Sequence, residues 1–231
     1  MNKRLPYIAL PLNDEDFDSK LEKAYYRGID IIEFRVDLLN NRNIDYIIQH
    51  LRKIKEKGLK TILTIRAKWE GGGCEIDDKE RLNIFEKSIN LVDFIDIELS
   101  SIDIREDVIN LGRKYGTQII ISYHDFEKTP SDEVIQKIID DTFSLGGDIS
   151  KLAFKVNNEN DVGRILSISY KNKSLGRKLI AIGMGELGKI TRVAGYFFGS
   201  MITYTYIGKS VAPGQIEINK LLEELKFYGL R

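Results

Sequence analysis

The chain has 231 residues, of which 42% are hydrophobic and 10% aromatic, so it can form a sizeable core and global disorder is excluded. Its 35 Lys and Arg residues balance its 35 Asp and Glu residues, so the protein has no net positive charge that would attract nucleic acid or an anionic membrane to its surface as a whole. A single cysteine, Cys74, excludes an internal disulfide and a multi-thiolate metal site. Apolar runs are far shorter than the ~20 residues of a membrane span, and the N-terminal residues show no signal peptide. We therefore expect a cytoplasmic protein with neither membrane nor nucleic-acid partners.

Short apolar runs alternate with amphipathic stretches along the whole chain. Strands are predicted at 6–11, 29–36, 60–66, 94–99, 117–123, 149–156, 178–183 and 201–207. Several of these runs are apolar at both odd and even positions, which is typical of a parallel sheet buried on both faces. Apolar residues at helical spacing predict helices between the runs, clearest over 44–57, 134–143 and 216–227. Eight strand–helix units with a period of roughly 29 residues predict a single-domain (β/α)8 TIM barrel over 1–231, with a doubly wound open sheet as the competing fold.

In a barrel of this kind the functional site lies at the C-terminal ends of the strands. Glu33 and Arg35 are two residues apart in a largely apolar run, so they share one face and are more consistent with a barrel mouth than with a solvated surface. His124 follows the apolar run 119–123, and an imidazole there suits proton transfer near neutral pH. His50 is expected to be a solvated residue on the polar side of its helix. Two histidines so far apart predict no metal site.

Two lysines lie within the apolar run 151–156, at Lys151 and Lys155. An ammonium group is unfavourable in such a strand, and a buried lysine with a lowered pKa can attack a carbonyl as an amine. The two lysines share a face, so spacing does not choose between them. Either one is also compatible with a lysine that snorkels at the strand edge.

A G-x-G-x-x-G pattern at 183–188 follows a predicted strand, as a dinucleotide fingerprint does. No Asp or Glu lies between Leu187 and Ile216, so the acidic ribose partner of that fingerprint is missing. The same stretch carries Lys189, Arg192 and Lys209. This local excess of positive charge predicts an anionic small molecule at the ends of the last two strands.

Two further segments, 71–73 and 209–215, are rich in small residues. The triple glycine of the first predicts a mobile loop. The second is expected to be a loop that can close over a ligand. For both, an ordinary connection between elements is the simpler alternative.

Seven groups of residues, in this order, resemble the type I 3-dehydroquinate dehydratase family of the shikimate pathway of aromatic amino acid biosynthesis. They are EFRVD at 33–37, TIR at 64–66 with EGG at 70–72, DIEL at 96–99, SYHDF at 122–126 with TP at 129–130, DISKLA at 148–153, MG at 184–185 with TR at 191–192, and APGQ at 212–215. The resemblance covers nearly the whole chain. It implies a (β/α)8 barrel, a lyase that removes water from 3-dehydroquinate to give 3-dehydroshikimate through a Schiff base, and a homodimer.

The resemblance also implies roles for individual residues. Lys151 matches the imine-forming lysine, His124 the general acid and base, and Glu98 a carboxylate close to the catalytic histidine. The residues that match substrate-binding positions are Glu33, Arg35, Arg66, Arg192, Ser210 and Gln215. No metal and no organic cofactor is needed for this chemistry, because the imine itself acts as the electron sink.

Two consequences for the site follow from elementary chemistry. Arg35 and Arg66 near Lys151 are expected to favour the neutral, nucleophilic amine by like-charge repulsion. Arg192 offers a planar fork for the substrate carboxylate. The alternatives are another Schiff-base barrel, such as a class I aldolase, and a non-catalytic nucleotide-binding protein that uses the glycine pattern.

Overall fold

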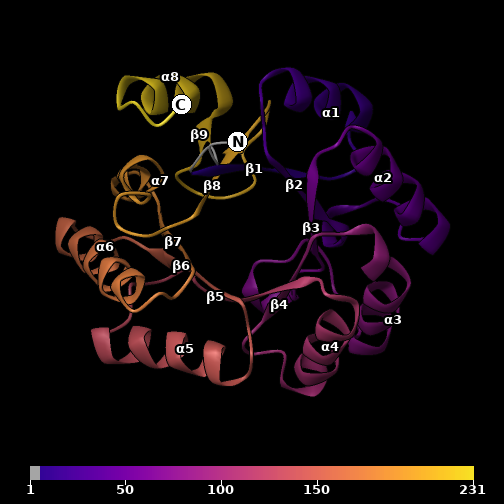
Figure 1. The fold of residues 1–231 in the computed structure, drawn as a ribbon, viewed down its shortest axis with the longest axis horizontal. Coiled ribbons are helices and arrows are strands. Elements are labelled where there is room, and N and C mark those ends of the chain that lie inside the picture. Colours follow the sequence, from indigo (N-terminus) through magenta and orange to yellow (C-terminus); the bar gives the residue numbers. More distant parts are fainter. Residues whose placement is uncertain (1–5) are drawn as a thin grey trace.

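Eight parallel strands form a ring in the computed structural model, which describes residues 6–231. The strands are β1 (Tyr7–Leu12), β2 (Ile31–Arg35), β3 (Lys60–Thr64), β4 (Phe94–Glu98), β5 (Gln118–Asp125), β6 (Ile149–Lys155), β7 (Leu179–Met184) and β8 (Ile202–Tyr206). Pairing runs in chain order from β1 to β7, and β1 also pairs with β8 (Figure 1). Within residues 6–231, β7 and the segment leading into β8 form one parallel bridge, between Leu179 and Ser200, beside which the Ala181 N–H donates to Ser200 Oγ at 3.0 Å. This ring confirms the predicted barrel, and the β1–β8 pairing excludes the open sheet.

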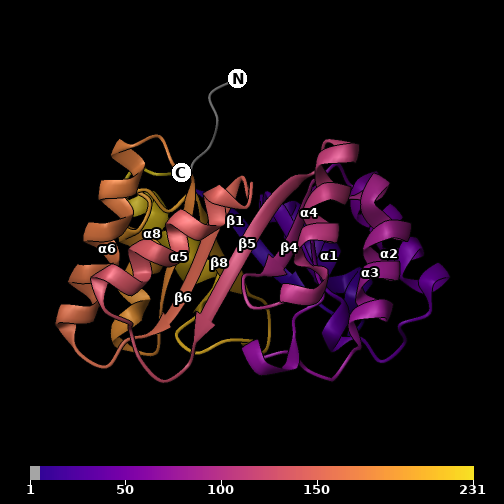
Figure 2. The same cartoon turned by 90° about the horizontal axis from the view of Figure 1, so that it is seen from below.

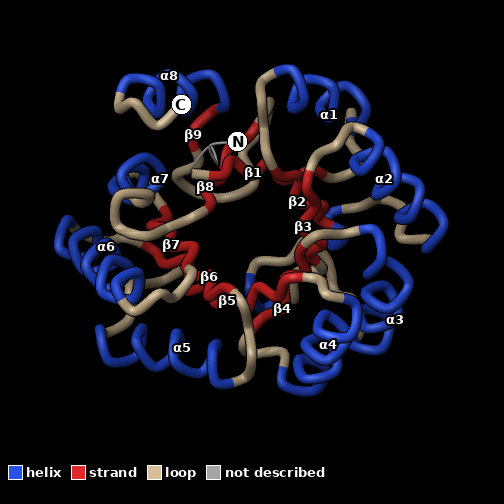
Figure 3. The backbone as a smooth tube through the Cα atoms, in the orientation of Figure 1, coloured by secondary structure: helices blue, strands red, loops and turns tan. Residues whose placement is uncertain are grey.

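Helices cover the outside of the ring, one after each strand (Figure 3). They are α1 (Phe17–Tyr26), α2 (Ile44–Glu56), α3 (Asp78–Ser88), α4 (Ile102–Tyr115), α5 (Asp132–Ser144), α6 (Glu159–Ser174), α7 (Thr191–Ala194) and α8 (Ile218–Phe227). Side chains such as Asn43, Asp77 and Ser131 cap the helices that follow them by accepting a backbone N–H. The last predicted helix begins two residues late, because Ile216–Glu217 forms a short strand, β9, that pairs with β8.

The interior of the barrel has an apolar floor with a polar layer above it. The floor consists of one side chain from each of the eight barrel strands, namely Ala9, Ile31, Ile62, Phe94, Ile120, Ile149, Ile180 and Ile202. Side chains two residues further along the same strands point to the same side. That next layer contains Glu33, Thr64, Asp96, Ser122, Lys151 and Tyr204, all of them buried. The opposite sides of the strands pack against the helices, which explains why the runs lack a simple alternation.

The loops after the strands gather at one edge of the barrel, toward which β5 and β6 point in Figure 2. Short 3-10 helices follow three of these strands, namely η1 (Val36–Leu38), η2 (Lys68–Glu70) and η4 (Leu187–Ile190). They turn the chain back over the barrel mouth. A fourth, η3 (Ile89–Leu91), continues α3 toward β4.

The prediction that His50 is solvated is wrong. Its side chain is buried between α1 and β2, with its ring 4.5 Å from the Phe17 ring and 5.8 Å from the Phe34 ring. Its Nδ1 lies 2.8 Å from the Tyr46 carbonyl oxygen. The apolar periodicity of α2 identifies only the side of the helix that packs against the strands. His50 lies on another side of α2, which α1 covers.

None of the helices within residues 6–231 combines the length and the apolar character needed to cross a bilayer. The prediction that residues 1–14 contain no signal peptide falls in part on residues 1–5, which lie outside the described part of the chain.

Candidate active site

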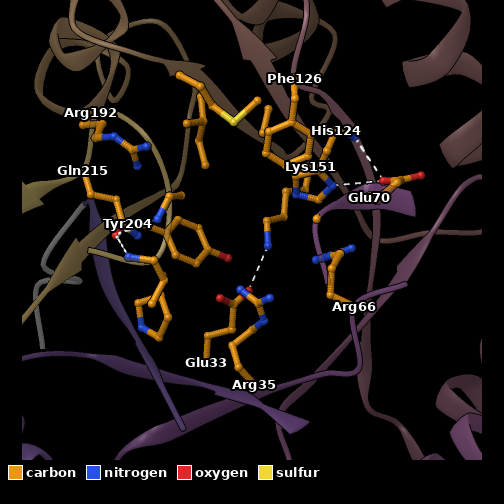
Figure 4. Close-up of a pocket in the computed structure, with 17 residues that line it drawn as sticks. Glu33, Arg35, Arg66, Glu70, His124, Phe126, Lys151, Arg192, Tyr204 and Gln215 are labelled. Carbon is orange, nitrogen blue, oxygen red and sulfur yellow. Dashed lines mark hydrogen bonds and ion pairs between the residues drawn. The ribbon is translucent and has the colours of Figure 1, made fainter. Parts of the chain in front are cut away.

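A cavity of about 620 Å³, counting the part open to solvent, lies at the C-terminal mouth of the barrel. Seven of the nine residues predicted for the site line it: Glu33, Arg35, Arg66, His124, Lys151, Arg192 and Gln215 (Figure 4). These side chains come from six different strands or the loops that follow them, as expected for a barrel site. The other two predicted residues, Glu98 and Ser210, are not in the lining.

Lys151 lies deep in this cavity and is only 4% exposed. Its Nζ is 2.9 Å from Oε1 of Glu33 and 2.8 Å from Oδ2 of Asp96. Burial by itself lowers the pKa of Lys151, but Asp96 and then Glu33 raise it above the ordinary value. The lysine therefore rests as an ammonium ion in the free protein. Lys155, by contrast, does not line the cavity.

The expectation that neighbouring arginines keep Lys151 neutral is wrong. Arg66 does lower the pKa of Lys151, but less than the two carboxylates raise it. The physical reason is that Arg66 is itself neutralised, since its guanidinium lies 2.8 Å from Asp96 and 2.8 Å from Glu98. Burial raises the pKa of Asp96, but Arg66 and Lys151 reverse this and hold it well below its usual range. Asp96, which the sequence analysis did not select, is thus a charged partner of both cations.

Glu98 is fully buried and is directed away from His124 by its own partners. Its Oε1 accepts hydrogen bonds from Arg66 Nη1 and from the Ala67 backbone, and its Oε2 accepts from Arg81 Nη2 and Ser101 Oγ. No hydrogen bond joins Glu98 to His124 among the contacts of residues 6–231. The structure therefore gives no support to the prediction of Glu98 as the histidine's carboxylate.

The carboxylate that contacts His124 is Glu70, at the end of η2. Its Oε2 accepts the backbone N–H of His124 at 3.1 Å and lies 3.0 Å from Nδ1 of the same residue (Figure 4). Because Oε2 already accepts one N–H, we assign Nδ1 as a second donor, which leaves Nε2 to accept a proton. The only signal for Glu70 in the sequence was its place shortly after a strand, in the EGG segment.

Burial dominates the protonation of this pair. It lowers the pKa of His124 well below its usual range, and the charges of Arg66 and Lys151 add to the effect. The imidazole is therefore neutral at neutral pH and able to act as a base. Burial also raises the pKa of Glu70 to about 7, against the hydrogen bond from Ser100 and the charge of Arg66, which lower it.

Arg35 forms a bidentate pair with Asp37, at 2.9 Å from Nε and 2.6 Å from Nη2. Asp37 also accepts the backbone N–H groups of Arg66 and Gly73. A Cβ atom at Gly72 would collide with the carbonyl oxygen of Arg66. The glycine segment 71–73 is therefore packed and hydrogen-bonded against its neighbours, contrary to the expectation of a mobile loop.

Arg192 is buried without an acidic partner among the described residues. Its Nε donates to the Gly214 carbonyl at 2.7 Å and its Nη2 to the Pro213 carbonyl at 3.3 Å. Burial lowers the pKa of Arg192 to about 10, so the guanidinium stays charged at neutral pH. A buried cation that contacts only neutral carbonyls favours an anionic ligand.

The loop 209–215 forms one wall of the cavity. Oε1 of Gln215 accepts hydrogen bonds from Ser210 Oγ at 3.0 Å and from the Val211 backbone at 2.9 Å. The Ser210 hydroxyl also contacts the Ala212 carbonyl at 2.7 Å, so Ser210 holds the loop together. Its neighbour Val211 lines the cavity in its place.

The glycine pattern at 183–188 serves close backbone packing. A Cβ at Gly188 would collide with the backbone of Gly183, and a Cβ at Gly214 would collide with the carbonyl oxygen of Gly185. The helix that follows, α7, has only four residues, unlike the long helix of a dinucleotide fold. Within residues 6–231, no group of three or more His, Cys, Asp or Glu side chains is placed to hold a metal ion.

Comparison with known proteins agrees with this geometry. Residues 8–231 match the family model described as type I 3-dehydroquinase. The chain is 43% identical over 224 residues to the 3-dehydroquinate dehydratase of Hydrogenobaculum sp. (strain Y04AAS1), covering 97% of this chain and 99% of that protein. It is 40% identical over 232 residues to the one from Methanocaldococcus jannaschii, covering 97% and 100%.

The chain belongs to the type I 3-dehydroquinase family. The crystal structure of the 3-dehydroquinate dehydratase from Aquifex aeolicus VF5 superposes with a TM-score of 0.88 at 42% identity, covering 96% of this chain and 98% of that one. As a type I 3-dehydroquinase, the protein is an enzyme of the hydro-lyase class. Membership decides against the aldolase and the nucleotide-binding alternatives.

Proposed function

We propose that the protein removes water from 3-dehydroquinate to give 3-dehydroshikimate through an imine on Lys151. The observation that carries this proposal is a single buried lysine at the base of the cavity, with the neutral imidazole of His124 in the same cavity. An amine can form the imine, and an imidazole with a free Nε2 can move protons.

The first step requires Lys151 to lose a proton, because the resting group is an ammonium ion. Glu33 is the better acceptor of the two adjacent carboxylates. Within residues 6–231 its one other hydrogen bond comes from the Thr64 hydroxyl at 3.2 Å, whereas Asp96 is also bound by Arg66 and by Ser122 at 2.6 Å. The free amine then attacks the ketone carbon, loss of water gives the imine, and the proton held by Glu33 returns to the imine nitrogen.

The elimination itself follows from the electron demand of the protonated imine. It acidifies the neighbouring carbon, and we assign removal of that proton to Nε2 of His124. The electron pair moves into the imine system and then expels the hydroxyl group on the β carbon, which takes a proton from the imidazolium and leaves as water. Hydrolysis of the imine releases the conjugated ketone and restores Lys151. Glu70 orients the imidazole through Nδ1, so we propose Glu70 in the role first expected of Glu98.

Arg192 is proposed to bind the substrate carboxylate, since it is the buried cation of the cavity that lacks an acidic partner among the described residues. Arg35 and Arg66 are already paired with carboxylates, so they are proposed to contact substrate hydroxyl groups with their remaining edges. Gln215 lines the same cavity and is proposed to contact the substrate from the loop 209–215. Ser210 is proposed to act only through this loop.

Borohydride trapping tests the proposal directly, because it reduces an imine to a stable amine. We expect conversion of 3-dehydroquinate to a product with enone absorbance, and ligand mass on the peptide that contains Lys151. Lys151→Ala should abolish both signals. The matched control is Lys155→Ala, which removes a lysine from the same strand outside the cavity and should retain both. Mass on Lys155, or turnover in Lys151→Ala, would contradict the imine assignment.

We also propose that the protein is a homodimer and that it is located in the cytoplasm. Exposed apolar side chains at Leu187 and Ile190 on η4 are consistent with a contact between two copies of the chain. Sedimentation equilibrium of the purified protein would measure its mass in solution. A mass of one chain at micromolar concentration would exclude a stable dimer.

A further inference from the structure

The phenol of Tyr204 is a buried polar group that the chemistry above does not use. Tyr204 lies on β8, two residues beyond Ile202 of the apolar floor, in the same layer as Glu33 and Lys151. Its side chain lines the cavity although the residue is only 4% exposed. Figure 4 shows its hydroxyl group directed toward the amine of Lys151. The Nζ atom of that lysine lies 4.8 Å from the centre of the Tyr204 ring.

The Tyr204 hydroxyl is fully buried, and its O–H has no acceptor within residues 6–231, since the Lys151 ammonium beside it can only donate. Leaving a buried donor unpaired is unfavourable, and buried tyrosine hydroxyls usually find a partner. A phenylalanine would fill the same space, and would keep the favourable contact between the ring and the ammonium, without this cost. The hydroxyl therefore points to a partner that arrives with a ligand.

The other polar groups beside the lysine amine are already engaged with one another. The carboxylates of Glu33 and Asp96 can only accept hydrogen bonds while they are ionised. The nearby donors already point at these carboxylates, namely Thr64, Ser122 and Arg66. Next to the Lys151 amine, the Tyr204 hydroxyl is thus a neutral donor that has no acceptor in the described part of the chain.

Resting on the proposed imine chemistry, we propose that the Tyr204 hydroxyl donates a hydrogen bond to the substrate oxygen on the carbon that Lys151 attacks. When the C–N bond forms, the electron pair of the C=O π bond moves onto this oxygen, and a donor aimed at it stabilises the developing charge. When the C=N bond forms, the same C–O bond breaks. The two protons that the nitrogen loses depart with the oxygen as water.

Tyr204 ends this step with its own proton. Burial raises the pKa of the phenol above its ordinary value, and the nearby ammonium opposes this only in part. The hydroxyl therefore remains a donor throughout, while Nε2 of His124 remains the acceptor. Imine formation and carbon deprotonation would then rely on different side chains of one cavity.

The test is Tyr204→Phe, which removes the hydroxyl and keeps the ring. Enzyme and 3-dehydroquinate are mixed, quenched with borohydride at successive times, and the adduct on Lys151 is measured by mass spectrometry. We expect the adduct to form about 100-fold more slowly than in the wild type, at the lower end of the effect of removing an oxyanion-hole donor. The melting temperature without ligand should be unchanged or higher, since an unpaired buried group has been removed.

The matched control is Tyr123→Phe, on β5. That tyrosine packs outside the barrel, with its ring 6.3 Å from Phe154, and its variant should form adduct at the wild-type rate. Adduct formation at the wild-type rate in Tyr204→Phe, with or without a raised KM, would overturn the inference. A lowered melting temperature would also overturn it, because the hydroxyl would then have a partner in the free protein. A wild-type protein that neither turns over nor traps adduct would instead refute the proposed function, and this inference with it.

Discussion

Replacing Lys151 by methionine should destabilise the free protein, because it leaves buried carboxylates without their cation. Asp96 keeps its ion pair with Arg66 at 2.8 Å, but Glu33 keeps only the Thr64 hydroxyl at 3.2 Å. Breaking a buried ion pair by removing one partner costs about 3–5 kcal/mol. Since one of the two carboxylates stays paired, we expect the lower end, about 3 kcal/mol.

Thermal unfolding followed by circular dichroism at pH 7 measures this cost. For a chain of this size, about 3 kcal/mol corresponds to a melting temperature roughly 6–12 °C lower. The matched variant is Lys151→Met with Glu33→Gln, which removes the unpaired carboxylate and should recover more than half of the loss. The two substitutions should therefore couple by about 1–3 kcal/mol in a double-mutant cycle.

A Lys151→Met protein as stable as the wild type, with no coupling to Glu33→Gln, would mean that Lys151 is a neutral amine in the free protein. It would restore the first expectation, in which the arginines keep the lysine deprotonated.

Three further outcomes are expected. The pKa of Glu70 is about 7 in the folded protein and 4.5 as a free side chain, so between these pH values the folded state binds more protons and its stability falls as pH rises. Glu70→Gln should remove about 3 kcal/mol of this fall, measured by urea unfolding between pH 4.5 and 7. The same dependence of stability on pH in the variant would contradict the raised pKa. Arg192→Ala should raise KM by the equivalent of roughly 2–5 kcal/mol with a smaller change in kcat, because its proposed partner stays charged throughout the reaction; an unchanged KM with a much lower kcat would argue for a transition-state role. Steady-state activity should survive dialysis against EDTA, and a loss reversed by a divalent ion would contradict the imine mechanism.

The sequence was sufficient to predict the barrel, because its strands are apolar on both faces and recur at a regular interval. Observed strand boundaries differ from the predicted ones by at most two residues. The run 60–66 ends at Thr64, since the backbone N–H of Arg66 donates to Asp37 instead of to a neighbouring strand. The polar residues at these ends were also found from sequence, since they interrupt apolar runs.

Contacts between distant strands account for what the sequence did not reveal. Lys151 and Lys155 share a face, and only the register with neighbouring strands separates them: Lys151 lies opposite Ser122 in the buried layer, whereas Lys155 lies opposite Met184 at the end of β7. The pairing of Glu70 with His124 spans 54 residues and depends on the turn at η2. The charge of Lys151 likewise depends on carboxylates that other strands supply.

The barrel wall is not equally strong around its circumference. Each of the first six strands is joined to the next by a ladder of several residue pairs. Among the described residues, β7 meets the segment before β8 through one bridge, Leu179 to Ser200, and a hydrogen bond from the Ala181 N–H to Ser200 Oγ. Arg192 lies on the chain segment that spans this seam, and it is tied across to the loop 209–215 through the carbonyl of Gly214. Local opening of a protein occurs where few hydrogen bonds must break together. An anion bound by Arg192 would therefore hold the two sides of the seam together, so ligand binding in the cavity should disfavour local opening of the barrel wall at this place.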